Sequence, residues 1–145
     1  MKTPIHHEMN KMVDEVRCYL KARLERQAIS ALNESIRSLR IVVQQLLTDH
    51  FLTLPLPKAK EFRFALADQL SSVCNDLRNH NGCQPEDEDH HRYCIREVLV
   101  CFEWAEQIKE EVPDDPITQK ILAVDIPILR PFDYGIGKTR SFRKK

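Results

Sequence analysis

A chain of 145 residues that is 42% hydrophobic and 30% charged is long enough to form one core and too apolar to be disordered. Its 22 basic and 22 acidic residues balance, so no global charge drives it onto nucleic acid or an anionic membrane. Three glycines are too few for the many tight turns of sandwiches and barrels, and no apolar run is long enough to span a bilayer.

The first third of the chain is predicted to be helical. No glycine or proline occurs from His7 to Phe51, and apolar residues recur at helical spacing, with steps of three and four between Ile29 and Leu46. The apolar stripe changes phase after Leu24, which leaves either one long helix or a hairpin open. We favour a long helix with a bend, because no glycine marks a stop. Shorter neighbours would not cover both ends of such a rod, which would favour a homodimer.

A second helix is predicted to follow the prolines at 55 and 57, which lack amide donors and end the first segment. It should run over residues 58–79. Its expected buried stripe is Phe62, Leu66, Leu70, Val73 and Leu77. Gly82 can then supply the positive φ of a chain reversal, and the acidic residues 86–89 suit the start of the next helix.

The most apolar segment, residues 88–112, is expected to be the central helix. Two prolines at 113 and 116 end it, and a short helix should run over 116–124. The following residues contain further prolines and show no helical period. The sequence therefore predicts an all-α, antiparallel helical bundle of four to five helices over residues 1–125, with an extended, basic C-terminal arm over residues 126–145.

Five cysteines form an odd set without the spacing of a disulfide framework, which favours reduced thiols in the cytoplasm or nucleus. They include Cys94, which together with His80, Cys83 and His90 offers four ligands of the kind that zinc prefers. The spacing matches no standard zinc motif. We therefore prefer core packing for the thiols and surface positions for the histidines.

No residue set predicts catalysis. Residues 135–139, Gly-Ile-Gly-Lys-Thr, resemble the end of a phosphate-binding loop, but Phe132 stands where that motif needs its first glycine. The acidic residues of the central helix recur on its polar side and are interpreted as a solvated face, or as a contact surface for a basic partner. They are Glu103, Glu106, Glu110 and Glu111.

The arm combines six basic residues with three aromatic residues and a single acid from residue 130 onward. Its candidate binding residues are Arg130, Phe132, Tyr134, Lys138, Arg140, Phe142, Arg143, Lys144 and Lys145. Such a segment can dock in a groove of another protein, bind RNA or single-stranded DNA, or merely solubilise the chain while residues 126–129 pack back on the bundle. The neutral overall charge places nucleic acid behind protein docking.

We therefore expect a non-enzymatic adaptor or regulatory subunit that binds another protein, or a second copy of itself, through a helical face and the basic arm. The alternatives are a nucleic-acid-binding protein that uses the arm and a small zinc-stabilised helical domain. No other cofactor is expected, and no membrane association.

Overall fold

The computed structural model describes residues 4–112, 115–126 and 128–129. Within them there are five α-helices, two short 3₁₀ turns and no strand, which confirms the predicted all-α class. In chain order the elements are α1 (Pro4–Leu24), α2 (Ile29–Asp49), η1 (Phe51–Thr53), α3 (Leu56–Arg78), α4 (Pro85–Glu111), α5 (Pro116–Leu122) and η2 (Ala123–Asp125).

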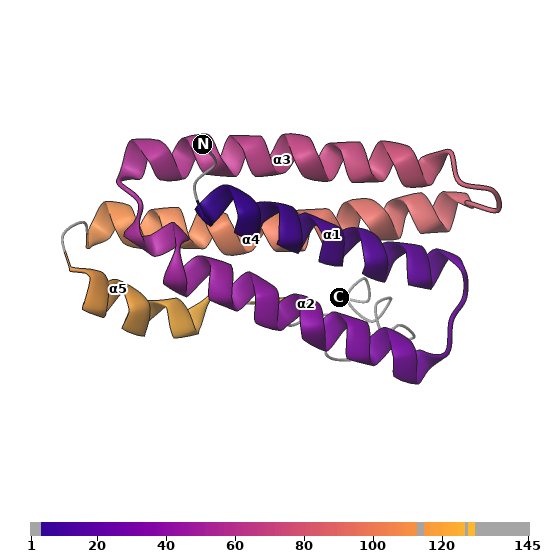
Figure 1. The fold of residues 1–145 in the computed structure, drawn as a ribbon, viewed down its shortest axis with the longest axis horizontal. Coiled ribbons are helices and arrows are strands. Elements are labelled where there is room, and N and C mark those ends of the chain that lie inside the picture. Colours follow the sequence, from indigo (N-terminus) through magenta and orange to yellow (C-terminus); the bar gives the residue numbers. More distant parts are fainter. Residues whose placement is uncertain (1–3, 113–114, 127, 130–145) are drawn as a thin grey trace, which may run out of the picture.

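The four long helices form two antiparallel hairpins, α1 with α2 and α3 with α4 (Figure 1). Helix α1 lies between α2 and the α3–α4 pair and contacts all three of these helices. Helix α4 contacts each of the other four helices, as expected of the predicted central helix. Helix α5 lies at the end of the bundle where α4 ends (Figure 1).

The expectation of one long helix through residues 7–51 is wrong, because the chain reverses between Leu24 and Ile29. Arg26 adopts a positive φ of 61°, and the Arg26 amide donates to the carbonyl of Arg23 at 3.0 Å. An arginine thus takes the left-handed conformation that glycine usually supplies. The phase change in the apolar stripe was the signal of this hairpin. Since α1 and α2 cover each other, the argument for a homodimer that rested on an uncovered rod no longer applies.

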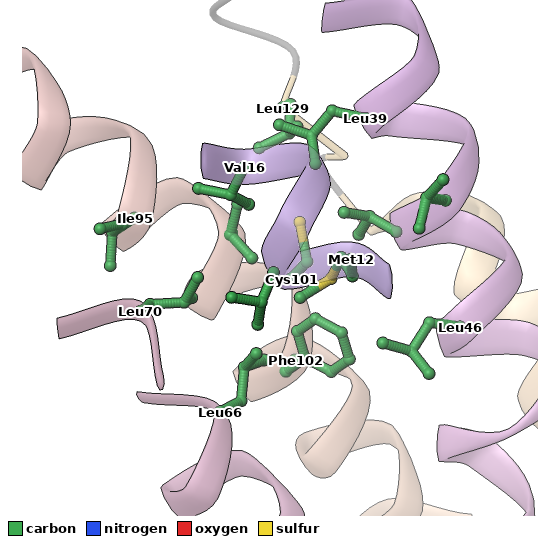
Figure 2. Packing of buried hydrophobic residues seen from close by; sticks show 14 of the residues in the cluster. Met12, Val16, Leu39, Leu46, Leu66, Leu70, Ile95, Cys101, Phe102 and Leu129 are labelled. Carbon is green, nitrogen blue, oxygen red and sulfur yellow. The ribbon is translucent and has the colours of Figure 1, made fainter. Parts of the chain in front are cut away.

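The core is formed where one stripe from each long helix meets the others. Figure 2 shows Met12 and Val16 of α1 facing Leu39 and Leu46 of α2 on one side. On the other side are side chains from α3 and α4, which are Leu66, Leu70, Ile95, Cys101 and Phe102. All of these side chains are buried, as is the whole stripe predicted on α3.

The chain returns to this core after η2, where Ile126 and Leu129 are both buried. Figure 2 shows Leu129 beside Leu39 of α2. The apolar start of the predicted arm therefore packs on the bundle. The rest of the arm lies outside the described residues.

Three of the four acidic residues expected on the polar side of α4 are exposed as predicted, which are Glu103, Glu110 and Glu111, and Glu106 is the exception. Glu106 is only 6% exposed and accepts a hydrogen bond from Nε of Arg63 on α3, while Nζ of Lys60 lies 3.7 Å from its other oxygen. Glu103 and Glu110 pair with the same two α3 residues, at 3.7 and 3.3 Å. A buried carboxylate requires such partners. Glu103, Glu106 and Glu110 therefore join α4 to α3.

Arg26→Gly and Arg26→Ala distinguish the hairpin from a continuous helix. Both remove the same side chain, including its contact with Asp87 at 3.4 Å. At a positive φ the glycine variant should be more stable by roughly 0.5–1 kcal/mol, because Cβ is strained there. In a continuous helix alanine would be favoured by about 1 kcal/mol instead. Urea unfolding of the two variants measures the difference, and greater stability of the alanine variant would contradict the hairpin.

Val98→Asp should abolish cooperative folding, because the Val98 side chain is fully buried in α4 and an unpaired buried charge costs several kcal/mol. That cost is comparable to the whole stability of an ordinary domain. Val124→Asp is the matched control, since Val124 is 67% exposed and its replacement should change stability by no more than about 0.5 kcal/mol. Thermal melting followed by circular dichroism measures both. A Val98→Asp protein that melts like the parent would mean that the core is placed incorrectly.

Candidate binding groove

The residues predicted to bind a partner in the arm all lie at or beyond Arg130, outside the described residues. Their role stays a prediction. The same holds for the phosphate-loop resemblance at residues 135–139.

The four candidate zinc ligands do not form a metal site. Nowhere in the described residues do three or more His, Cys, Asp or Glu side chains converge as metal ligands would. In the turn after α3, Nδ1 of His80 is 2.9 Å from the carbonyl oxygen of Asn81, and Sγ of Cys83 donates weakly to the carbonyl of Gln84. Cys94 is fully buried, and burial raises the pKa of its thiol. The structure thus gives the zinc alternative no site.

His90 belongs to the core and not to the surface. It is 7% exposed, and its Nε2 lies 3.3 Å from the hydroxyl of Tyr19 on α1. Burial lowers the pKa of His90 to about 3, and the nearby charges of Arg23 and His91 act in the same direction. The sequence held a signal for this position, because His90 precedes Cys94 and Val98 on the buried stripe by one and two turns.

An open groove of about 650 Å³ runs between α3 and α4 near their connecting turn. The α3 side chains that line it are Ser71, Cys74, Asn75 and Arg78, and the α4 side chains are Asp89, Arg92, Tyr93, Ile95, Arg96 and Leu99. Each set recurs at three and four residues, so each is one face of its helix. The α3 side chains nearest the middle of the groove are short, which leaves the space unfilled.

The turn between the two helices sets the alignment of the groove. Gly82 has a φ of 85°, which confirms the predicted reversal, and Pro85 begins α4. Asp87 accepts a hydrogen bond from the backbone amide of Gln84 at 2.9 Å, which satisfies a free donor at the start of α4. This tight connection brings Arg78, at the end of α3, beside the first turns of α4.

The floor of the groove is apolar and its rim is basic. Ile95 is buried at the floor, while Tyr93 and Leu99 remain half-buried. Both Arg78 and Arg96 are exposed on the rim, and neither has a carboxylate partner among the described residues. The third rim arginine, at position 92, is paired with Glu88 and Asp89 of its own helix. Neither guanidinium group is therefore held in an ion pair next to this apolar surface, and the charge of Arg96 acts only at a distance on its neighbour Glu97.

A small cavity of about 10 Å³ adjoins the groove, and Cys74, Arg78 and Arg92 line both spaces. His91, which is 2% exposed, also lines this cavity, and its Nδ1 has no hydrogen-bond partner among the described residues. Burial lowers the pKa of His91, so the ring is neutral near pH 7. The base of the groove thus carries one unsatisfied polar atom.

The groove contains one thiol, that of Cys74, and one phenol, that of Tyr93. Burial raises the pKa of the Cys74 thiol, which keeps it protonated, and a protonated thiol is a poor nucleophile. Burial also raises the pKa of Tyr93. Sequence reasoning missed this site because Arg78 and Arg96 look like ordinary surface residues. The half-buried Tyr93 and Leu99, which lie off the core stripe of α4, were the available signal.

His90 should make the protein less stable as the pH falls. Its pKa is lowered on folding, so between pH 6.5 and about 3 the unfolded chain binds a proton that the folded chain does not. The free energy of unfolding therefore keeps its full value above pH 6.5. It decreases below that pH, by roughly 2 kcal/mol at pH 5. Urea unfolding at pH 7 and pH 5 should show this loss in the parent and a smaller one in His90→Gln.

The control for this prediction is His7→Gln, because His7 is exposed on α1. That variant should keep the parental difference between the two pH values. Equal losses in all three proteins would show that His90 does not remain neutral in the folded chain.

No protein-family profile matches the chain, and neither a curated protein nor a solved structure is significantly similar to it. No described helix combines the length and apolar character that crossing a membrane requires. What the molecule does is therefore inferred from the chemistry of its own residues.

Proposed function

We propose that the protein is a non-enzymatic interaction module, an adaptor or regulatory subunit, which binds another protein through the α3–α4 groove and the basic arm of residues 130–145. The observation that carries this proposal is the groove itself, in which half-buried Tyr93 and Leu99 lie beside the uncompensated Arg78 and Arg96. Tyrosine and arginine are enriched where protein interfaces derive most of their binding energy.

The shape of the groove favours a polypeptide. Its α4 side extends from Asp89 to Leu99, which is roughly 15 Å of helix. That length matches about four or five residues of an extended peptide or about three turns of a helix. The groove is open along the helix pair, whereas small-molecule sites enclose most of their ligand. The adjoining cavity of about 10 Å³ has room for roughly one water molecule.

Nucleic acid is the weaker interpretation. A backbone of phosphates would use the two free arginines, but the apolar floor at Ile95 and Leu99 offers a surface that a sugar–phosphate chain does not use. The described groove has a single aromatic side chain, Tyr93, for base stacking. Nucleic acid binding is therefore treated as one outcome of the experiment below.

The proposal is tested by affinity capture from cell lysate with and without nuclease, followed by mass spectrometry. The baits are the full chain, Leu99→Glu, and a chain truncated after Leu129. The matched control is Ile41→Glu, because Ile41 is an aliphatic residue on α2 that is 51% exposed and does not line the groove. Circular dichroism and melting temperatures confirm that each bait is folded.

We expect a defined protein that is retained after nuclease treatment, binds the parent and Ile41→Glu alike, and is lost or reduced about tenfold or more with Leu99→Glu. A weaker signal from the truncated chain would assign part of the binding to the arm. Binding that disappears with nuclease would replace the proposal with nucleic acid. Capture that survives both the Leu99→Glu change and the truncation would exclude the groove and the arm.

A further inference from the structure

We infer that the α3–α4 groove takes an acidic segment of the partner, with carboxylates on Arg78 and Arg96 and an apolar side chain on Tyr93 and Leu99. This inference rests on the proposed function and adds the chemistry of the occupant. Two features carry it: the local excess of positive charge in an otherwise neutral chain, and the apolar floor on which that charge lies.

The positive charge is local because most carboxylates around the groove are already bound, while Glu86 and Glu97 form no ion pair with either arginine. Asp76 of α3 lies 2.9 Å from Arg17 on α1, and Asp87 accepts from the Gln84 amide and contacts Arg26. Two further carboxylates near the start of α4, at positions 88 and 89, pair with the arginine at 92. The only acidic residue in the groove lining is thus committed. Arg78 and Arg96 therefore attract a negative group from outside the described part of the chain.

The apolar floor strengthens that attraction. A peptide that covers Ile95, Tyr93 and Leu99 excludes water from the groove, and charge-assisted hydrogen bonds are stronger in a drier environment. Guanidinium groups bind carboxylates in a bidentate manner, which also fixes the register of the segment. An acidic segment without an apolar anchor would gain only the weak attraction of exposed ion pairs.

The positions of the two arginines suggest the spacing of the acidic residues. Arg78 lines the small cavity together with Glu88 and Arg92, so it lies beside the first turns of α4. Arg96 follows one to two turns later, roughly 6–12 Å along the helix axis. An extended peptide advances about 3.3 Å per residue. The segment should therefore carry two acidic residues about two to four positions apart.

A second copy of the chain does not supply this segment from its α4 carboxylates. Glu103, Glu106 and Glu110 are held by Arg63 and Lys60 of α3 within each molecule. Releasing them would leave Glu106, which is buried, without its partners. These carboxylates are therefore not the occupant, which we assign to a different protein.

The test selects peptides from a phage-displayed random library of twelve-residue sequences on the full-length protein. We expect enriched peptides with at least two acidic residues and one large apolar residue. A labelled synthetic copy of an enriched peptide is then titrated by fluorescence anisotropy. The double variant Arg78→Glu/Arg96→Glu should weaken its binding about tenfold or more, and added salt should weaken binding to the parent.

The matched control is Arg37→Glu/Lys120→Glu, which changes the net charge by the same amount at exposed positions on α2 and α5. It should bind the peptide within about twofold of the parent. Melting temperatures verify that both double variants fold. If the charge reversal does not fold, Arg78→Gln/Arg96→Gln takes its place, with a loss in the same direction.

The outcomes separate this inference from the proposed function. Neutral or basic peptides whose binding is lost with Leu99→Glu would overturn the acidic occupant and leave the groove as an interaction site. No enriched peptide, or peptides that bind every groove variant equally, would overturn both. A single-stranded oligonucleotide that displaces the peptide and binds more tightly would also overturn the inference, in favour of nucleic acid.

Discussion

The chain reversal between Leu24 and Ile29 places α1 against α2 and, at the same time, against the α3–α4 pair. Helix α1 contributes buried residues along most of its length, and the stripes of the other three long helices meet around it (Figure 2). If residues 4–49 formed one continuous helix, α1 would extend beyond the end of α2 and would not lie beside the α3–α4 pair. That pair would then lose the helix that covers it. The cost of holding Arg26 at a positive φ, roughly 1–2 kcal/mol, is small beside the apolar burial that the reversal permits.

The two ends of the α3–α4 pair differ in how their charged side chains are paired. Towards the end of α4, Glu106 and Glu103 form ion pairs with Arg63 and Lys60, which hold α4 against α3. Towards the start of α4, Asp87, Glu88 and Asp89 are bound within the turn and to their own helix, and Arg78 and Arg96 form no ion pair. The same two helices thus provide one end that holds the fold together and another that is available to bind.

The helices whose ends are marked by proline or glycine were predicted closely. Helix α3 was expected over 58–79 and lies at Leu56–Arg78, and α4 was expected over 88–112 and lies at Pro85–Glu111. The reversal at Arg26 was missed because Arg26 adopts a positive φ, and an arginine in the sequence does not predict that conformation. The groove could not be predicted from helical period alone. The groove depends on which face of α3 packs against which face of α4, and on the pairing of Arg92 with carboxylates of its own helix.

The burial of the thiols also determines how the molecule responds to oxidants. Burial raises the pKa of the thiols at positions 74, 83, 94 and 101, which keeps them protonated and slow to react. Cys18 departs from the core packing that was expected of the thiols, because it is exposed on α1. A chain with five thiols therefore presents one of them openly at its described surface.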